Sequence, residues 1–302
     1  MKRTESLLLC IALSLCLSWN AYCAETLRLR HIVSIYTDEN GGALKQPESV
    51  FCTPKNLLLV ADSGNNRLLK YTYADKNLTG GSEIKVAQLT YPLKVQVNSK
   101  GEMYALDGRQ RRIVRLTQDG QFKDYLTPVG IPSPEDFAIM SFTIDSDDHI
   151  YILDTFSKRV IHLNTEGSYQ WHINFPPDFG FFTDLSVDSK GSVFIVDSVQ
   201  ARVYSAAKDA GTFTPLGESL KKYAQFPTGI AVDKQGIIYL LDHNYASVSM
   251  LSQNGSFLGQ QLNLGWNEGL LYYPTKLYVN ESGEVFIADR GNNRIQIFNV
   301  VK

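Results

Sequence analysis

The chain has 302 residues, of which 44% are hydrophobic and 20% are charged, the balance of an ordinary soluble globular protein. Its net charge of −2 provides no long-range positive field, which argues against binding to nucleic acid or to an acidic membrane surface. Composition and charge therefore favour a folded domain whose partner is neither a nucleic acid nor a lipid surface.

The N-terminus has the pattern of a secretory signal peptide. Lys2 and Arg3 precede an apolar run over residues 7–19, which is shorter than the roughly 20 apolar residues that cross a bilayer. The pattern predicts a signal peptide over residues 1–24, a mature domain over residues 25–302, and export to the periplasm or the extracellular space.

Cleavage is expected after Cys23 or Ala24, because the small residues Ala21 and Cys23 then stand just before the cut. A lipid anchor on Cys23 is the less favoured alternative, because the bulky Tyr22 stands where that processing usually has a small residue. Cys52 is then the one cysteine certain to remain, and a lone cysteine forms no internal disulfide. We expect Cys52 to be a buried packing thiol, and the stability of the fold to come from its apolar core.

A short line of sequence recurs six times along the chain. It reads ADSGNNRLL from residue 61 and ADRGNNRIQ from residue 288. The aspartates of the six copies are Asp62, Asp107, Asp154, Asp197, Asp242 and Asp289. Their spacings of 45, 47, 43, 45 and 47 residues are too regular for two domains and indicate a repeat architecture.

The units share a plan of four short runs rich in Val, Ile, Tyr and Phe, separated by turn residues. Four strands per unit and six units predict an all-β fold, a six-bladed β-propeller, in which each blade buries both faces against its neighbours. The last unit stops after its third strand, at residues 299–302. The strand predicted over residues 26–36 has no unit of its own, so we expect this N-terminal strand to complete the last blade and to remove an exposed edge.

The line D-x-G-N-N-R-[IL] after an apolar strand, with P-x-G-I-A-V-D before that strand, resembles the NHL repeat family. The resemblance covers the mature chain and is strongest in the first and sixth units. It implies a six-bladed propeller, the form most often taken by the family, and an interaction module whose ligand the resemblance does not name.

The repeated polar residues are expected to hold the frame together, because a reaction at one place does not need the same pair in five units. The arginines that stand five residues after an aspartate are Arg67, Arg112, Arg159, Arg202 and Arg294. We expect the aspartates to accept hydrogen bonds from backbone N–H groups of the following turn, and the arginines to satisfy carbonyls or carboxylates at the same rim. Gly64 and Gly291 are expected to allow positive φ in the tightest turns, a conformation that Asn also tolerates.

Function is expected where the units differ, on the face that carries the loops between second and third strands and the connections between blades. The candidate binding residues on this face are Gln110, Phe156, Lys158, Gln200, His243, Asn244, Tyr245 and Trp266. The connections at 175–182 and 264–273 are unusually apolar, so their aromatic residues either wedge between blades or form an exposed ligand platform.

Metal-binding and catalytic patterns are weak. Some propellers that resemble this family hold an axial metal on several histidines, and others hold an axial calcium on carboxylates and amides. The histidines are His31, His149, His162, His172 and His243. They fall at non-equivalent positions of the repeat and are not expected to meet. The stretch DSDDHI at 145–150 resembles a calcium-binding loop, but it occupies the same turn as DSKG and NSKG in sister units, and we expect a solvated turn. The inner strands are expected to present mostly apolar and hydroxyl side chains.

The sequence therefore favours an exported, monomeric propeller that acts as a non-enzymatic binding or scaffold module, without metal or cofactor. Its expected partner is a protein, a peptide or an envelope polysaccharide, with no nucleic acid and no transmembrane span. The alternative is a metal-dependent propeller enzyme of the lactonase or lyase type with an axial site.

Overall fold

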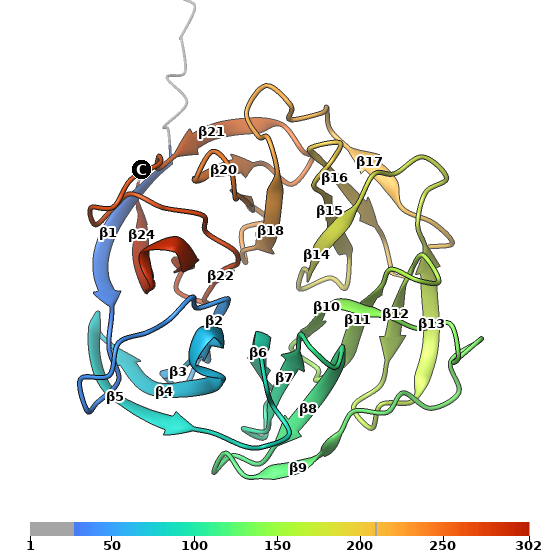
Figure 1. Ribbon diagram of the computed structural model, residues 1–302. Coiled ribbons are helices and arrows are strands. Elements are labelled where there is room, and N and C mark those ends of the chain that lie inside the picture. Colours follow the sequence, from blue (N-terminus) through green and yellow to red (C-terminus); the bar gives the residue numbers. More distant parts are fainter. Residues whose placement is uncertain (1–26, 209, 302) are drawn as a thin grey trace, which may run out of the picture.

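The computed structural model describes residues 27–208 and 210–301, and its strands form six four-stranded antiparallel sheets around a central axis (Figure 1). The predicted all-β, six-bladed propeller is confirmed. The expected signal peptide at 1–24 and the possible lipid anchor at Cys23 lie outside the described residues. Within the described part of the chain, no helix is long and apolar enough to cross a membrane.

Strand order is the same in every blade, from the axis outward. The innermost strands are β2 (Ser49–Cys52), β6 (Pro92–Val97), β10 (Ile139–Ile144), β14 (Phe182–Val187), β18 (Pro227–Val232) and β22 (Leu277–Val279). The second strands are β3 (Leu57–Asp62), β7 (Met103–Asp107), β11 (Ile150–Asp154), β15 (Val193–Asp197), β19 (Ile238–Asp242) and β23 (Glu284–Asp289).

The third and fourth strands complete each blade toward the outside. The third strands are β4 (Arg67–Ala74), β8 (Arg112–Leu116), β12 (Arg159–Leu163), β16 (Arg202–Ala206), β20 (Ser247–Leu251) and β24 (Arg294–Val301). The outer strands are β5 (Asn77–Ile84), β9 (Phe122–Tyr125), β13 (Tyr169–Asn174), β17 (Thr214–Leu216), β21 (Phe257–Gln261) and β1 (Arg28–Ile35). Two short 3-10 helices, η1 (Ser63–Asn65) and η2 (Arg290–Asn292), follow β3 and β23.

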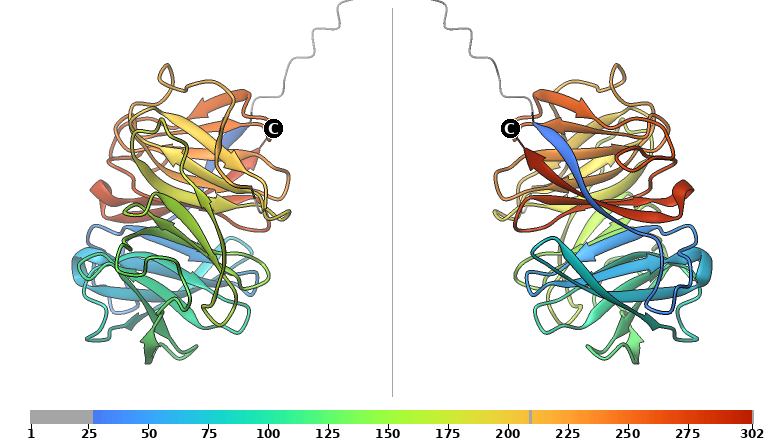
Figure 2. Two further views of the ribbon diagram at one scale, coloured as in Figure 1. Left: turned by 90° about the vertical axis from the view of Figure 1, so that its right-hand side faces the viewer. Right: turned by 90° about the vertical axis from the view of Figure 1, so that its left-hand side faces the viewer.

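The N-terminal strand closes the ring, as predicted. β1 pairs antiparallel with β24, from Arg28 opposite Val301 to Ile35 opposite Ile295, and so becomes the outer strand of the sixth blade (Figure 2). The two ends of the described chain therefore lie in one sheet. This pairing covers the edge that β24 would otherwise expose.

The core lies between the blades. One hydrophobic cluster joins Val60 and Tyr71 of the first blade to Phe286 and Ile295 of the sixth. Cys52 belongs to the same cluster and is 3% exposed, and burial, with the nearby charge of Glu284, raises the pKa of its thiol to about 12. Each blade thus needs its neighbours in order to bury its two faces.

The repeated aspartate joins two loops in each blade. In the second blade, Oδ2 of Asp107 accepts the N–H of Thr90 at 2.6 Å, while Oδ1 accepts the N–H groups of Arg109 and Gln110 at 2.8 and 3.0 Å. The corresponding donors to the other five aspartates are the N–H groups of Lys45, Ala138, Gly180, Gln225 and Tyr272. Each buried carboxylate therefore fastens the connection that enters a blade to the end of its second strand.

The arginine pairs with this aspartate in only three of the five units. The Nε atoms of Arg67, Arg159 and Arg294 donate to the Oδ2 atoms of their aspartates at 2.8, 3.1 and 2.7 Å. Among the described residues, the buried Nε atoms of Arg112 and Arg202 have no hydrogen-bond partner, and the guanidinium of Arg112 lies 3.7 Å from the ring centre of Tyr125. The aspartate thus makes its contact with the incoming connection in all six blades, whereas the arginine pairs with the aspartate in some blades only.

The expectation for Gly64 and Gly291 is wrong. The positive φ belongs to Asn66 and Asn293, at 56° and 53°, and not to the glycines. A Cβ on Gly64 would instead lie 2.6 Å from the carbonyl oxygen of Lys45. Glycine is required there because the backbone of the incoming connection passes too close for any side chain.

We predict that Asp62→Ala or Asp289→Ala lowers the free energy of unfolding by about 1–3 kcal/mol, because buried N–H donors lose their acceptor. Thermal and urea unfolding measure the change. Asp119→Ala, in an exposed turn, is the matched control and should leave stability unchanged. An unaltered melting temperature in both rim variants would contradict the structural role of the aspartate.

Candidate functional site

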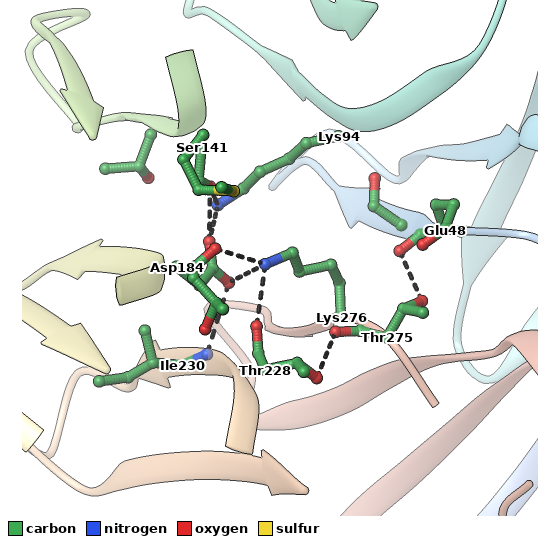
Figure 3. A network of polar contacts seen from close by, with 12 residues as sticks. Glu48, Lys94, Ser141, Asp184, Thr228, Ile230, Thr275 and Lys276 are labelled. Carbon is green, nitrogen blue, oxygen red and sulfur yellow. Dashed lines mark hydrogen bonds and ion pairs between the residues drawn. The ribbon is translucent and has the colours of Figure 1, made fainter. Parts of the chain in front are cut away.

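The axis brings together one residue from each innermost strand or its start. These six residues stand 13 positions before the repeated aspartates: Ser49, Lys94, Ser141, Asp184, Gly229 and Lys276. In four blades the register between the first and second strands shifts immediately before this position. Such a β-bulge changes the direction of a side chain. Lys94 and Asp184 follow such a bulge, and they meet Lys276, which directly precedes β22, at the axis (Figure 3).

The Asp184 carboxylate lies at the centre of this group. Its Oδ1 accepts hydrogen bonds from Nζ of Lys94 at 2.8 Å and from Oγ of Ser141 at 2.6 Å. Its Oδ2 lies 3.2 Å from Nζ of Lys276 and 3.5 Å from the backbone nitrogen of Ile230. Four blades thus contribute to the surroundings of one carboxylate.

The two lysines differ in how many of their Nζ–H groups have a hydrogen-bond acceptor. Nζ of Lys276 donates to the carbonyl oxygens of Thr228 at 2.9 Å and Thr183 at 3.2 Å, and it pairs with Asp184, so all three N–H groups have acceptors. Nζ of Lys94 donates to Asp184 and, at 3.1 Å, to Ser141. Within the described chain this leaves one N–H of Lys94 available to a ligand.

The group carries one more positive than negative charge. The side chain of Asp184 is 2% exposed, and those of Lys94 and Lys276 are 12% and 18% exposed. One carboxylate cannot neutralise two ammonium groups, and charges removed from water are normally paired. The axis therefore favours an additional anion.

Burial and mutual attraction set the pKa values at the axis. Burial by itself opposes ionisation of Asp184, but the ammonium groups of Lys276 and Lys94 and the hydrogen bonds outweigh it and hold the pKa of this carboxyl below its ordinary value. Burial lowers the pKa of Lys276, and the attraction of Asp184 offsets only part of that effect. Asp184 is thus held as a carboxylate between two cations.

A cavity of about 350 Å3 lies over this group. Its apolar wall includes Leu93, Met140 and Phe226. Its polar wall includes three residues from the loops between second and third strands: Arg111, His243 and Arg290. Arg290 is neutralised by Glu48, with 2.8 Å between Nε and Oε1. The cavity thus combines an apolar side with a surplus of positive charge.

The NHL repeat family model matches residues 271–298, which form most of the sixth blade, and the other five blades repeat its plan. The chain thus carries an NHL repeat in its sixth blade and folds as a six-bladed β-propeller.

Several solved structures share the fold of this NHL-repeat propeller. A virginiamycin B lyase from Staphylococcus aureus matches with a TM-score of 0.61 and 13% identity, over 91% of this chain and 88% of that one. A gluconolactonase from Xanthomonas campestris matches with a TM-score of 0.66 and 12% identity, over 91% and 90%. A luciferin-regenerating enzyme matches with a TM-score of 0.61 and 14% identity, over 91% and 95%. At these identities the likeness shows the fold alone.

A search of curated protein sequences gives no match to the NHL-repeat propeller.

One of the predicted binding residues lines the axial cavity. His243 does so, with its Nδ1 2.9 Å from the carbonyl oxygen of Pro274. The predicted residues that do not line it are Gln110, Phe156, Lys158, Gln200, Asn244, Tyr245 and Trp266. Their role in binding stays a prediction, and Phe156 and Trp266, at 62% and 75% exposed, are the most open of the aromatic ones.

The two apolar connections differ. In the first, Phe175 and Phe182 are buried in the core of the third and fourth blades, and Phe181 is exposed. In the second, Trp266 and Tyr273 are exposed. The first connection therefore packs mainly between blades, whereas the second presents aromatic rings to solvent.

One sequence-based expectation about the site is incomplete and another is wrong. The inner strands present mostly apolar and hydroxyl side chains, as expected, but Lys94 and Asp184 of these strands also meet Lys276 on the axis. The expectation that the histidines do not meet fails for one pair. The rings of His149 and His162 lie 5.0 Å apart, with Asp145 beside them, at the opposite end of the strands.

The axial residues do not fit a divalent cation. A hard cation such as Ca2+ takes six to eight oxygen ligands, several of them carboxylates. Here Asp184 is the one carboxylate of the group, and the ammonium of Lys276 already lies among the oxygens of Asp184, Thr183 and Thr228. None of the described innermost strands contains a histidine. The lysines thus take the place that a metal would need.

We predict that Asp184→Asn lowers the free energy of unfolding by about 3–5 kcal/mol at pH 7, because two buried ammonium groups lose their counter-charge. The native pKa of Asp184 lies below its ordinary value, so its contribution is present above about pH 4 and disappears as the pH falls through the native pKa. Urea unfolding between pH 7 and pH 3 should therefore show the difference from the wild type shrinking below about pH 4. A difference that stays constant over this range would contradict the assignment, and Asp119→Asn is the control.

Proposed function

We propose that this NHL-repeat propeller is an exported binding module that takes a carboxylate group of its ligand into the axial cavity. The observation that carries the proposal is the buried group of Lys94, Asp184 and Lys276, whose two ammonium groups face one carboxylate. A ligand carboxylate supplies the missing negative charge. Export rests on the signal-like pattern of residues 1–24.

The contacts at the axis support a carboxylate as the anion. Lys94 keeps one N–H donor for a ligand oxygen, and a charge-assisted hydrogen bond of this kind is among the stronger ones in proteins. Arg111 and His243 add further polar groups to the cavity wall. The cavity can thus hold the charged end of a ligand at its floor and polar atoms higher up.

The size and lining of the cavity describe the rest of the ligand. A volume of about 350 Å3 is at the small end of the range for small-molecule sites, and Leu93 and Phe226 offer it an apolar wall. The cavity is therefore large enough for one terminal residue of a peptide or polysaccharide, and too small for a folded protein. A peptide C-terminus and the uronic acid of a polysaccharide both supply a carboxylate on such a residue.

Calorimetric titration with two matched pairs of probes tests the proposal. The pairs are galacturonate with galactose, and N-acetyl-trialanine with its C-terminal amide. We expect the acid of one pair to bind at least about tenfold more tightly than its neutral partner, a difference of about 1.4 kcal/mol. The pair that shows this difference identifies the source of the carboxylate. Equal affinity within both pairs, or no binding of either acid at millimolar concentration, would refute the proposal.

Two substitutions at the axis should change affinity in opposite directions. Lys94→Met should weaken binding of the acid about tenfold, because it removes the available donor. Asp184→Asn should strengthen it in the molecules that remain folded, because it removes the carboxylate that competes for the same lysines. Lys190→Met, in the exposed turn between β14 and β15, is the control, because this turn does not line the cavity; the variant should bind the acid as the wild type does.

An enzyme acting in the same cavity is the second candidate, because burial lowers the pKa of Lys276 and groups with shifted pKa values are frequent at catalytic sites. The solved structures that share the fold include a gluconolactonase. To test this candidate, hydrolysis of glucono-lactone is measured by pH titration in the presence of EDTA. If the protein hydrolyses the lactone and Lys276→Met abolishes this activity, an enzyme is favoured over a binding module. Absence of turnover is expected if the cavity only binds.

A further inference from the structure

A second polar cluster lies on the face opposite to the axial cavity, in the third blade. Asp145 and His149 belong to the turn between β10 and β11, and His162 lies on β12 opposite Tyr151 of β11. One carboxylate oxygen and one ring nitrogen of each histidine all lie within 4.8 Å of one another. Three groups able to bind a metal therefore converge at one place.

The turn holds the carboxylate in a fixed orientation. Oδ1 of Asp145 accepts the N–H groups of Asp147 and His149, both at 2.9 Å. Oδ2 lies 3.3 Å from Nδ1 of His149 and accepts the hydroxyl of Tyr151 at 3.2 Å. One oxygen is thus used by the fold, and the other faces the histidines. A hydroxyl that orients a ligand carboxylate is common around metal sites.

The sister blades show that the fold does not need the histidines. The same turn is closed by Asn98, Asp188, Asp233 and Asn280, each of which accepts two backbone N–H groups through Oδ1. The positions equivalent to His149 are occupied by Glu102, Ser192, Ile237 and Glu284. The positions equivalent to His162 are occupied by Lys70, Arg115, Ser205, Met250 and Ile297. An imidazole pair beside the turn is therefore particular to the third blade.

The two imidazoles are placed differently with respect to solvent. His162 is 5% exposed, and its ring stacks on Trp171 with centroids 4.3 Å apart and an angle of 10° between planes. The side chain of His149 is 35% exposed. Packing thus fixes the ring of His162, while the partly exposed side chain of His149 has room to change its rotamer.

We propose that Asp145, His149 and His162 form a binding site for a divalent transition metal of the zinc type, with water in the remaining position. Two imidazoles and one carboxylate suit Zn2+, Ni2+ or Cu2+ better than Ca2+ or Mg2+, and three protein ligands with an open position are typical of accessible zinc sites. Bonds of about 2.0–2.1 Å place tetrahedral ligand atoms roughly 3.4 Å apart. The three ligand atoms, which now lie within 4.8 Å of one another, therefore have to move closer when the metal binds.

Metal titration of untagged mature protein, after dialysis against EDTA, tests the site. We expect one equivalent of Zn2+ to bind saturably and to raise the melting temperature by about 5 °C at a concentration 100-fold above its Kd. Co2+ should produce the strong visible absorption of a tetrahedral site. Ca2+ and Mg2+ at the same concentrations should produce no such shift.

His149→Gln is the decisive variant, because His149 is partly exposed and its loss leaves the core intact. It should abolish both the zinc shift and the cobalt spectrum. His172→Gln is the matched control, since His172 contacts Tyr169 outside the cluster and the variant should behave as the wild type. Zinc binding that is absent in the wild type, or equal in the wild type and His149→Gln, would overturn the proposal.

Discussion

No blade of this propeller can bury its two faces alone, and this constraint determines the rest of the structure. Each blade is covered by its neighbours, so the six must form a closed ring. The pairing of β1 with β24 closes it between the ends of the described chain. The repeated aspartates then fix each incoming connection against its blade. Closure and these rim contacts together hold the six innermost strands at equal positions around one axis.

The closed ring also explains why the functional group forms at the axis. Lys94, Asp184 and Lys276 are separated by 90 and 92 residues in the chain, yet they occupy the same position in blades two, four and six. Only a ring with the right number of blades makes them neighbours. Their combined charge favours an anion and disfavours a divalent cation. The axis therefore differs from an axial calcium site, whose ligands include several carboxylates. The cluster at Asp145 depends on one blade alone and is independent of this group.

The fold was predictable because the repeated aspartate marks every unit at a nearly constant spacing. The axial group was equally present in the sequence, 13 residues before each aspartate, but reading each strand for its average hydropathy hides one charged residue among apolar neighbours. Comparing the same position across the six units would have revealed Lys94, Asp184 and Lys276. The meeting of His149 and His162 was harder to predict, because it depends on the register that places His162 opposite Tyr151. The need for glycine at Gly64 depends on a close approach of backbone that no local pattern records.

The crystal structure of the mature protein with a bound acidic probe tests the central claim most directly. We predict a carboxylate oxygen at hydrogen-bond distance, about 2.8 Å, from Nζ of Lys94, with Lys276 still bound to Asp184. A ligand bound elsewhere, or a divalent cation at the axis with Lys276 displaced, would contradict it.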